Sequence, residues 1–81
     1  MSKVVNVPFD LINVVEEVPV LSPNPGQVAF FADLIESGED LQPIFVYPKD
    51  NRYILVDGIN RLEAHRLIGL KTIKAILVDL V

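Results

Sequence analysis

The hydrophobic positions of this chain form short runs typical of strands and longer stretches typical of helices. Lys3 to Pro8 is rich in β-branched residues and stops at a proline, which predicts a short strand. The next segment is less regular: residues 10–13 indicate a turn and residues 14–21 extended chain, interrupted by Glu16 and Glu17. The N-terminal part therefore predicts one strand followed by an irregular connection.

A helix is predicted after the loop formed by residues 22–26. Asn24 is suited to the N-cap, Pro25 to the first helical position, and Gln27 follows at the spacing of a capping box. Apolar residues then recur at helical spacing, at Val28, Phe31, Leu34 and Ile35. Gly38 is suited to a left-handed cap, so the helix is expected to end there.

The second half of the chain predicts strands on either side of another helix. Residues 43–57 predict a β-hairpin whose strands meet at the turn signal Lys49-Asp50-Asn51. A helix is expected from Asn60 to Ile68, where Gly69 stops it, and a last strand from Lys71 to Val81. The resulting order is β–α–β–β–α–β, without internal repeats.

This order indicates an α+β fold in which both helices pack on a small mixed sheet. A length of 81 residues predicts that residues 1–81 form a single domain. Hydrophobic residues make up 51% of the chain, enough for a core and too many for a disordered tail.

Composition then excludes several kinds of chemistry. The chain has no cysteine, which excludes disulfides and thiolate catalysis, and its single histidine argues against a zinc site. A formal net charge of -4 argues against unaided binding to a DNA backbone, although four residues form a candidate basic patch: Arg61, Arg66, Lys71 and Lys74. The sequence shows no signal peptide and no membrane-spanning run, which predicts a soluble cytoplasmic protein.

The strongest candidate for a functional site is the corner between the hairpin and the second helix. Gly58 permits a sharp turn and close approach of a ligand, and a helix start attracts anions through its unpaired N–H groups. Either Asp57 or Asn60 can cap the helix, and Arg61 offers a guanidinium that can swing toward the same anion. The alternative is common architecture, with Asp57 simply pairing with Arg61.

Other residues near this corner allow two interpretations each. His65 shares a helix face with Arg61 and either borders the same pocket or is a packing residue. Gln42 either meets a ligand or satisfies loop backbone. Glu16 and Glu17 are candidate catalytic residues, as a general base or magnesium ligand, or else form a solvated turn. The aromatic residues favour packing over base stacking: Phe30, Phe31, Phe45, Tyr47 and Tyr53.

Residues 34–80 resemble the ParB/sulfiredoxin superfamily domain, and residues 3–12 resemble its first strand and turn. The matching pieces are residues 34–38 (Leu-Ile-Glu-Ser-Gly), 41–46 (Leu-Gln-Pro-Ile-Phe-Val), 52–58 (Arg-Tyr-Ile-Leu-Val-Asp-Gly) and 60–78. Members of this superfamily bind nucleotides with the glycine turn and the arginine. The resemblance therefore implies a nucleotide cofactor, either ATP, ADP or CTP with Mg²⁺, at a phosphate site lined by Asp57, Gly58, Ile59, Asn60 and Arg61.

The branches of this superfamily differ at the corner. ParB partition proteins carry a Gly-Glu-Arg-Arg type motif, where this chain has Ile59 and Asn60 in the middle. The chain also ends before their further nucleotide motif and helix-turn-helix domain, which argues against a full partition clamp. Sulfiredoxins carry Gly-Cys-His-Arg, so Ile59 excludes their chemistry. Free-serine kinases carry Asp-Gly-His-His-Arg, of which Asp57, Gly58 and Arg61 match, and Glu16 or Glu17 falls roughly where their base glutamate is expected.

Three hypotheses follow. The first is a stand-alone nucleotide-binding module, regulatory and linked to DNA-partition or transcription machinery. The second is a small nucleotide-dependent kinase or hydrolase, with Arg61 on the transferred phosphate and Asp57 near magnesium. The third is a protein-interaction module without ligand, in which an apolar Ile59 at the mouth of the site suits a protein partner. Direct DNA binding is disfavoured by the acidic charge, which leaves it to a separate partner chain.

Overall fold

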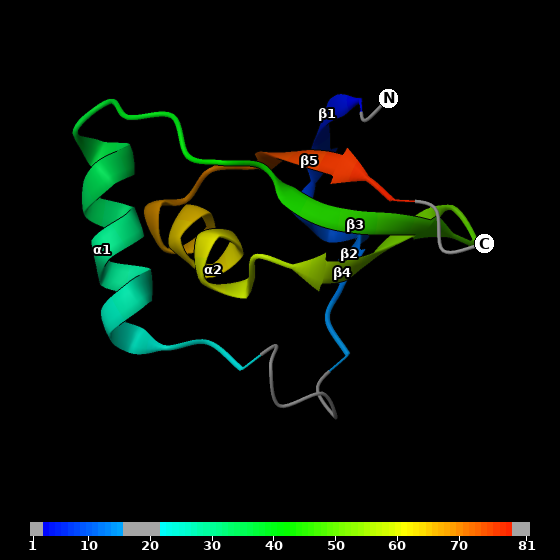
Figure 1. Ribbon diagram of the computed structural model, residues 1–81, viewed down its shortest axis with the longest axis horizontal. Helices are drawn as coiled ribbons and strands as arrows, with labels where there is room; N and C mark the ends of the chain where they lie inside the picture. Colours follow the sequence, from blue (N-terminus) through cyan, green and yellow to red (C-terminus); the bar gives the residue numbers. More distant parts are fainter. Residues whose placement is uncertain (1–2, 16–21, 79–81) are drawn as a thin grey trace.

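The strands assemble as one mixed sheet in the computed structural model, which describes residues 3–15 and 22–78 (Figure 1). Within these residues the sheet has five strands in the order β1-β5-β3-β4-β2. The strands are β1 (Val4–Pro8), β2 (Ile12–Asn13), β3 (Ile44–Lys49), β4 (Arg52–Asp57) and β5 (Thr72–Leu77). The predicted α+β class with a small mixed sheet and two helices is confirmed.

Parallel and antiparallel pairs alternate across this sheet. β1 pairs with β5 and β3 with β4 in antiparallel fashion, whereas β5 with β3 and β4 with β2 are parallel. The β3–β4 hairpin turns at Asp50 and Asn51, which both have positive φ, at 53° and 64°. Two consecutive residues in this conformation match the twist of a hairpin, and Asp and Asn tolerate it, so the predicted turn is confirmed.

The segment after β1 is more regular than its sequence indicates. A 3-10 turn, η1 (Phe9–Leu11), leads into the two-residue strand β2, where the sequence predicts only a turn. β2 exists because it lies parallel to Tyr53 and Ile54 of β4, a tertiary pairing without local signal. The extended chain predicted for residues 14–21, with Glu16 and Glu17, lies mostly outside the described residues, as does the predicted end of the last strand at 79–81.

Helix α1 (Pro25–Glu36) begins and ends as its sequence predicts. Asn24 Oδ1 accepts a hydrogen bond from the N–H of Gln27 at 3.2 Å, and Pro25 occupies the first turn. Gly38 has φ +87° and follows the last turn, where the N–H of Glu39 donates to Leu34 O. In a capping box, the side chain of Gln27 would accept from the N–H of Asn24. Here that N–H donates instead to Asn60 Oδ1 at 2.7 Å, so only half of the predicted capping box forms.

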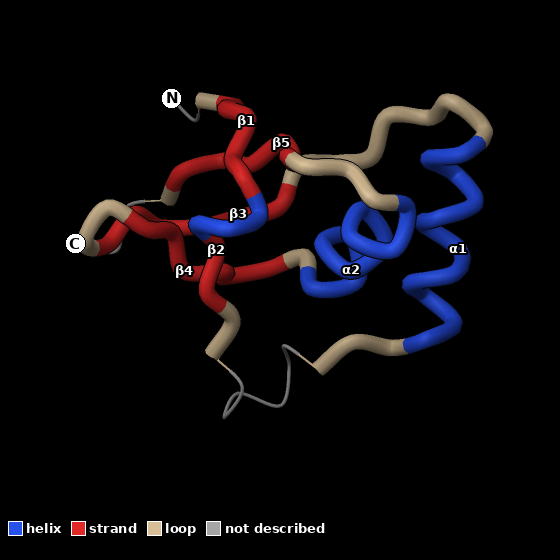
Figure 2. The backbone as a smooth tube through the Cα atoms, turned by 180° about the vertical axis from the view of Figure 1, so that it is seen from behind, coloured by secondary structure: helices blue, strands red, loops and turns tan. Residues whose placement is uncertain are grey.

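Only one of the two helices lies directly on the sheet. Helix α2 (Ile59–Ile68) has three buried residues, of which Ile59 and Leu62 belong to the core, whereas α1 buries only Ala32 among its described residues. Figures 1 and 2 show α2 between α1 and the sheet, and the contacts of α1 are chiefly with α2. The expectation that both helices pack on the sheet is therefore wrong for α1, whose apolar stripe faces α2 instead.

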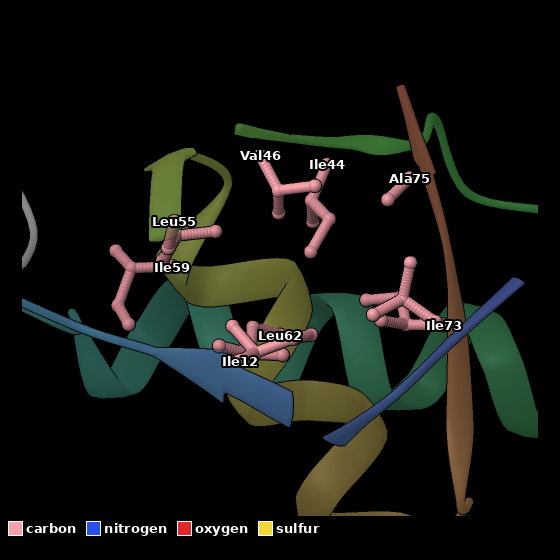
Figure 3. Close-up of a cluster of buried hydrophobic side chains, with 9 residues drawn as sticks. Ile12, Ile44, Val46, Leu55, Ile59, Leu62, Ile73 and Ala75 are labelled. Atoms are coloured by element: carbon pink, nitrogen blue, oxygen red, sulfur yellow. The ribbon is translucent and has the colours of Figure 1, made fainter. Parts of the chain in front are cut away.

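The core lies between α2 and one face of the sheet (Figure 3). Its buried side chains come from every strand and from α2: Val7, Ile12, Ile44, Val46, Leu55, Ile59, Leu62, Ile73 and Ala75. Among the described residues, none with a polar or charged side chain is fully buried. The described part of the chain contains no helix of the length and hydropathy needed to cross a membrane.

Truncating Leu62 tests the central position of α2. Leu62 is fully buried, so Leu62→Ala should lower the free energy of unfolding by about 2–5 kcal/mol, measured by urea denaturation. Leu67 in the same helix is 69% exposed, so Leu67→Ala should change stability by only about 0.5 kcal/mol. Equal losses in the two variants would contradict this packing.

Candidate functional site

Gly58 forms the corner between β4 and α2. Its φ of +106° places it in the left-handed region that favours glycine. A Cβ added there would lie 2.6 Å from Ile44 Cγ2 and 3.0 Å from Ile44 Cβ, too close for any side chain. Two independent constraints therefore require glycine: the backbone conformation, and the close approach of the α2 start to β3.

The start of α2 has no cap from any side chain in the described part of the chain. The predicted caps are both wrong: Asp57 makes no such hydrogen bond, and the Oδ1 atom of Asn60 accepts from the N–H of Asn24 instead. Gly58 O accepts the first intrahelical bond, from the N–H of Leu62. The N–H groups of the first turn thus form the positive end of the helix dipole, and no side chain of the described residues caps them.

Arg61 lies across this corner in a fixed position rather than free to swing. Its Nη1 donates to the backbone oxygens of Gln42 and Pro43, at 3.3 Å and 3.2 Å. Its Nη2 lies over Gly58, 3.2 Å from the point where a Cβ would stand. No Asp57–Arg61 ion pair forms among the described residues, whose ion pairs are Arg66–Glu63 and Lys74–Asp40. One edge of the guanidinium holds the chain while the other remains beside the helix start.

A cleft of about 480 Å³ opens in front of this corner. The structure brings six of the sequence-predicted site residues together in its lining: Gln42, Asp57, Gly58, Ile59, Asn60 and Arg61. The opposite wall is α1 with its following loop, a contribution that the sequence interpretation missed: Gln27, Phe31, Leu34, Asp40 and Leu41. The helical spacing of residues 27, 31 and 34 does indicate that they share one face of α1. The sequence does not distinguish a cleft wall from core packing on that face, because it does not show which element the face meets.

Ile59 belongs to the core, and only a small part of it contributes to the lining of the cleft. Its side chain is 6% exposed and lies in the buried cluster with Leu55 and Leu62 (Figure 3). Its remaining contribution to an anion site is its backbone N–H. The argument for a protein-interaction module from an apolar residue at the mouth is therefore wrong, because the side chain is unavailable to a partner.

His65 lies on a different cleft from Arg61. That neighbouring cleft, of about 280 Å³, is lined also by Lys71 and Lys74. His65 Nδ1 lies 2.7 Å from Arg61 O, so Nδ1 carries the proton and donates, and its ring lies 6.5 Å from that of Phe9. The prediction that His65 borders the phosphate pocket is corrected, and these contacts match the packing interpretation.

The charges around the cleft are mixed. Asp40 and Asp57 lie in its lining with Arg61. Asp40 is 90% exposed and 3.5 Å from Lys74 Nζ, a surface pair that contributes little to stability. The described residues contain no group of three or more His, Cys, Asp or Glu side chains that could hold a metal ion. Glu16 and Glu17 lie outside the described residues.

The predicted basic patch is dispersed. Arg61 faces the cleft, Arg66 Nε lies 3.5 Å from Glu63 Oε2, and Lys74 pairs with Asp40. The acids beside Arg66 and Lys74 weaken the attraction of these two cations for a DNA backbone, and Lys71 lines the same cleft as Lys74.

The five-stranded sheet with its two helices has the ParB/sulfiredoxin-like α+β fold, and three solved structures share this fold. A sulfiredoxin from Arabidopsis thaliana has a TM-score of 0.78 at 28% identity, over 95% of this chain and 85% of that one. A truncated ParB from Caulobacter crescentus, complexed with CTP-gamma-S, has a TM-score of 0.80 at 23% identity, over 98% and 46%. A free serine kinase complexed with AMP has a TM-score of 0.75 at 20% identity, over 94% and 31%.

Sequence comparison defines the family more narrowly. The ParB N-terminal domain family matches residues 1–81, and this chain belongs to that family. A probable chromosome-partitioning protein ParB from Campylobacter jejuni is 34% identical over 73 residues, which are 79% of this chain and 26% of that protein. The chain thus spans about a quarter of the length of this relative.

The corner can be tested by adding a methyl group to Gly58. Gly58→Ala combines positive φ with a clash against Ile44, whereas Gly69→Ala carries positive φ alone, since nothing lies within 4 Å of its Cβ. We expect Gly58→Ala to lower the free energy of unfolding by about 1–3 kcal/mol more than Gly69→Ala does, as overpacking adds to backbone strain. Equal unfolding midpoints for the two variants in urea would contradict the close contact with Ile44.

Proposed function

We propose that this domain binds a nucleotide in the cleft between α1 and the start of α2. Phosphates bind the free N–H groups of residues 59–61 and the Nη2 edge of Arg61, and the nucleoside extends along the α1 wall of Gln27, Phe31 and Leu34. The single observation that carries this proposal is an uncapped helix start with an arginine already held beside it, inside a cleft.

Membership of the ParB N-terminal domain family supports a nucleotide as the ligand, because a ParB of the same fold has been solved with CTP-gamma-S. CTP is therefore the first candidate, and ATP and ADP are the alternatives. Asp57 or Asp40, which lie in the same cleft, would hold a Mg²⁺ ion that offsets the negative charge of the phosphates. These two carboxylates repel a bare polyphosphate, so the metal is expected to raise affinity.

We place the domain in the cytoplasm as a regulatory part of DNA-partition or transcription machinery. The relative from Campylobacter jejuni is a probable chromosome-partitioning protein, which supports this setting. The acidic net charge and the pairing of Arg66 and Lys74 with acids favour nucleotide and protein partners for this domain, with DNA contacted by a partner.

Substitution of Arg61 tests the phosphate site. Isothermal titration with Mg–CTP should show binding to the natural protein and a loss of about tenfold to a hundredfold in Arg61→Ala, since a charge-assisted contact is removed. Arg66→Ala is the matched control, because Arg66 lies in the same helix outside the cleft and pairs with Glu63. Thermal unfolding confirms that each variant is folded. Absence of binding at millimolar CTP, ATP and ADP would reject the proposal.

We expect binding without transfer of phosphate to serine. Ile59 and Asn60 replace the two histidines of the free-serine-kinase motif; the first is buried and the oxygen of the second holds Asn24. Incubation with free serine and Mg–ATP or Mg–ADP, followed by phosphoserine detection, should give no product above the protein-free control. Phosphoserine formation that disappears in a Glu16→Ala/Glu17→Ala variant would contradict this expectation and establish the kinase alternative.

A further inference from the structure

Helix α1 contacts the rest of the described chain chiefly through one neighbour, α2, and most of its residues remain at least partly exposed. It packs chiefly on α2 and buries only Ala32, while its exposed face includes Phe30. Yet α1 supplies one entire wall of the nucleotide cleft through Gln27, Phe31 and Leu34. The width of the cleft therefore depends on how firmly a weakly buried helix is docked against α2.

Consecutive residues in the first turn of α2 hold the two segments that flank α1. Asn60 Oδ1 accepts from the N–H of Asn24, directly before α1, at 2.7 Å. Arg61 Nη1 donates to the backbone oxygens of Gln42 and Pro43, in the loop that follows α1. The same helical turn that offers its N–H groups to phosphate thus fixes the entry and the exit of the facing wall.

We infer that Asn60 is a positioning residue for the nucleoside half of the ligand. Its side-chain oxygen acts through the backbone of Asn24, which lies outside the cleft lining, and keeps α1 at the spacing that the nucleoside requires. This inference rests on the proposed nucleotide function. It goes beyond that function because it gives the hydrogen bond between Asn24 and Asn60, here called the Asn24–Asn60 tie, a role in binding the nucleoside and none in binding the phosphates.

Docking of α1 before the ligand arrives preorganises the cleft. A ligand that bridges the α2 start and the α1 wall binds more tightly when the wall is already docked, because docking no longer costs binding free energy. Inorganic triphosphate reaches only the α2 start and gains nothing from the wall. Losing the tie should therefore weaken a nucleotide by about threefold to tenfold, the equivalent of one net hydrogen bond, and leave inorganic triphosphate unchanged.

The first experiment measures the tie without any ligand. Amide hydrogen exchange by NMR should be about threefold to tenfold faster in α1 of Asn60→Ala than in the natural protein, with the amides of β3 and β5 unchanged. Asn60→Asp retains an oxygen at the same position and should restore the slow exchange. Equal α1 exchange in the natural protein and Asn60→Ala would overturn the inference.

The second experiment breaks the tie from the α1 side, away from the ligand. Asn24→Pro removes the donating N–H together with the side-chain cap, whereas Asn24→Ala removes the cap alone. Titrations of both variants with Mg–CTP and with magnesium triphosphate are compared, after thermal unfolding shows that both are folded. We expect a threefold to tenfold lower affinity of Asn24→Pro than of Asn24→Ala for CTP, and equal affinities for triphosphate.

The outcomes separate the inference from the proposed function. If the natural protein binds CTP and the two Asn24 variants bind it equally, or if CTP and triphosphate weaken in parallel, the positioning role is overturned and the nucleotide function stands. If the natural protein binds neither CTP nor triphosphate, the proposed function fails and the positioning role fails with it.

Discussion

The contact between Gly58 and Ile44 is the constraint on which the rest of the structure depends. It allows the backbone at the end of β4 to reverse direction directly over β3, so that α2 starts against the sheet. From that start Ile59 and Leu62 enter the core, and residues 58–61 line the cleft. A bulkier residue at this position would move α2, and with it the core, the cleft and the support of α1.

The residues that follow Gly58 differ from those in related motifs, and the structure shows what each of them does here instead. In the partition-protein, sulfiredoxin and kinase motifs the position after the glycine is polar, whereas here Ile59 is part of the hydrophobic core. The side-chain oxygen of Asn60 accepts a hydrogen bond from the N–H of Asn24. One edge of the Arg61 guanidinium donates to the backbone oxygens of Gln42 and Pro43. The side chains that carry chemistry in related motifs are thus replaced by groups that build the walls of a site.

Features decided by neighbouring residues were predictable from the sequence. The N-cap of α1 at Asn24, the left-handed glycines 38 and 69, and the hairpin turn at Asp50–Asn51 all depend on local backbone preferences, and the structure contains each of them. The corner at Gly58 was found for the same reason.

Features that depend on distant partners were not predictable: the docking of α1 on α2, the short strand β2, the Asn24–Asn60 tie and the burial of Ile59. Six of the predicted site residues meet in one cleft because they flank one corner and one loop, whereas His65, one helical turn further on, faces the next cleft.

The strand order has a consequence for the way the chain folds. β1 has β5 as its neighbour in the described sheet, with Val4 opposite Ile76, and β5 in turn joins β1 to β3. Until β5 is available, β1 therefore lacks this neighbour, and its backbone N–H and C=O groups remain exposed to water. Pairing β1 with β5 closes a loop that contains most of the described chain. The entropy of closing this loop is lost before the strand contacts form, which favours slow, late completion of the sheet. During synthesis, β1 therefore leaves the ribosome well before β5, the strand with which it pairs.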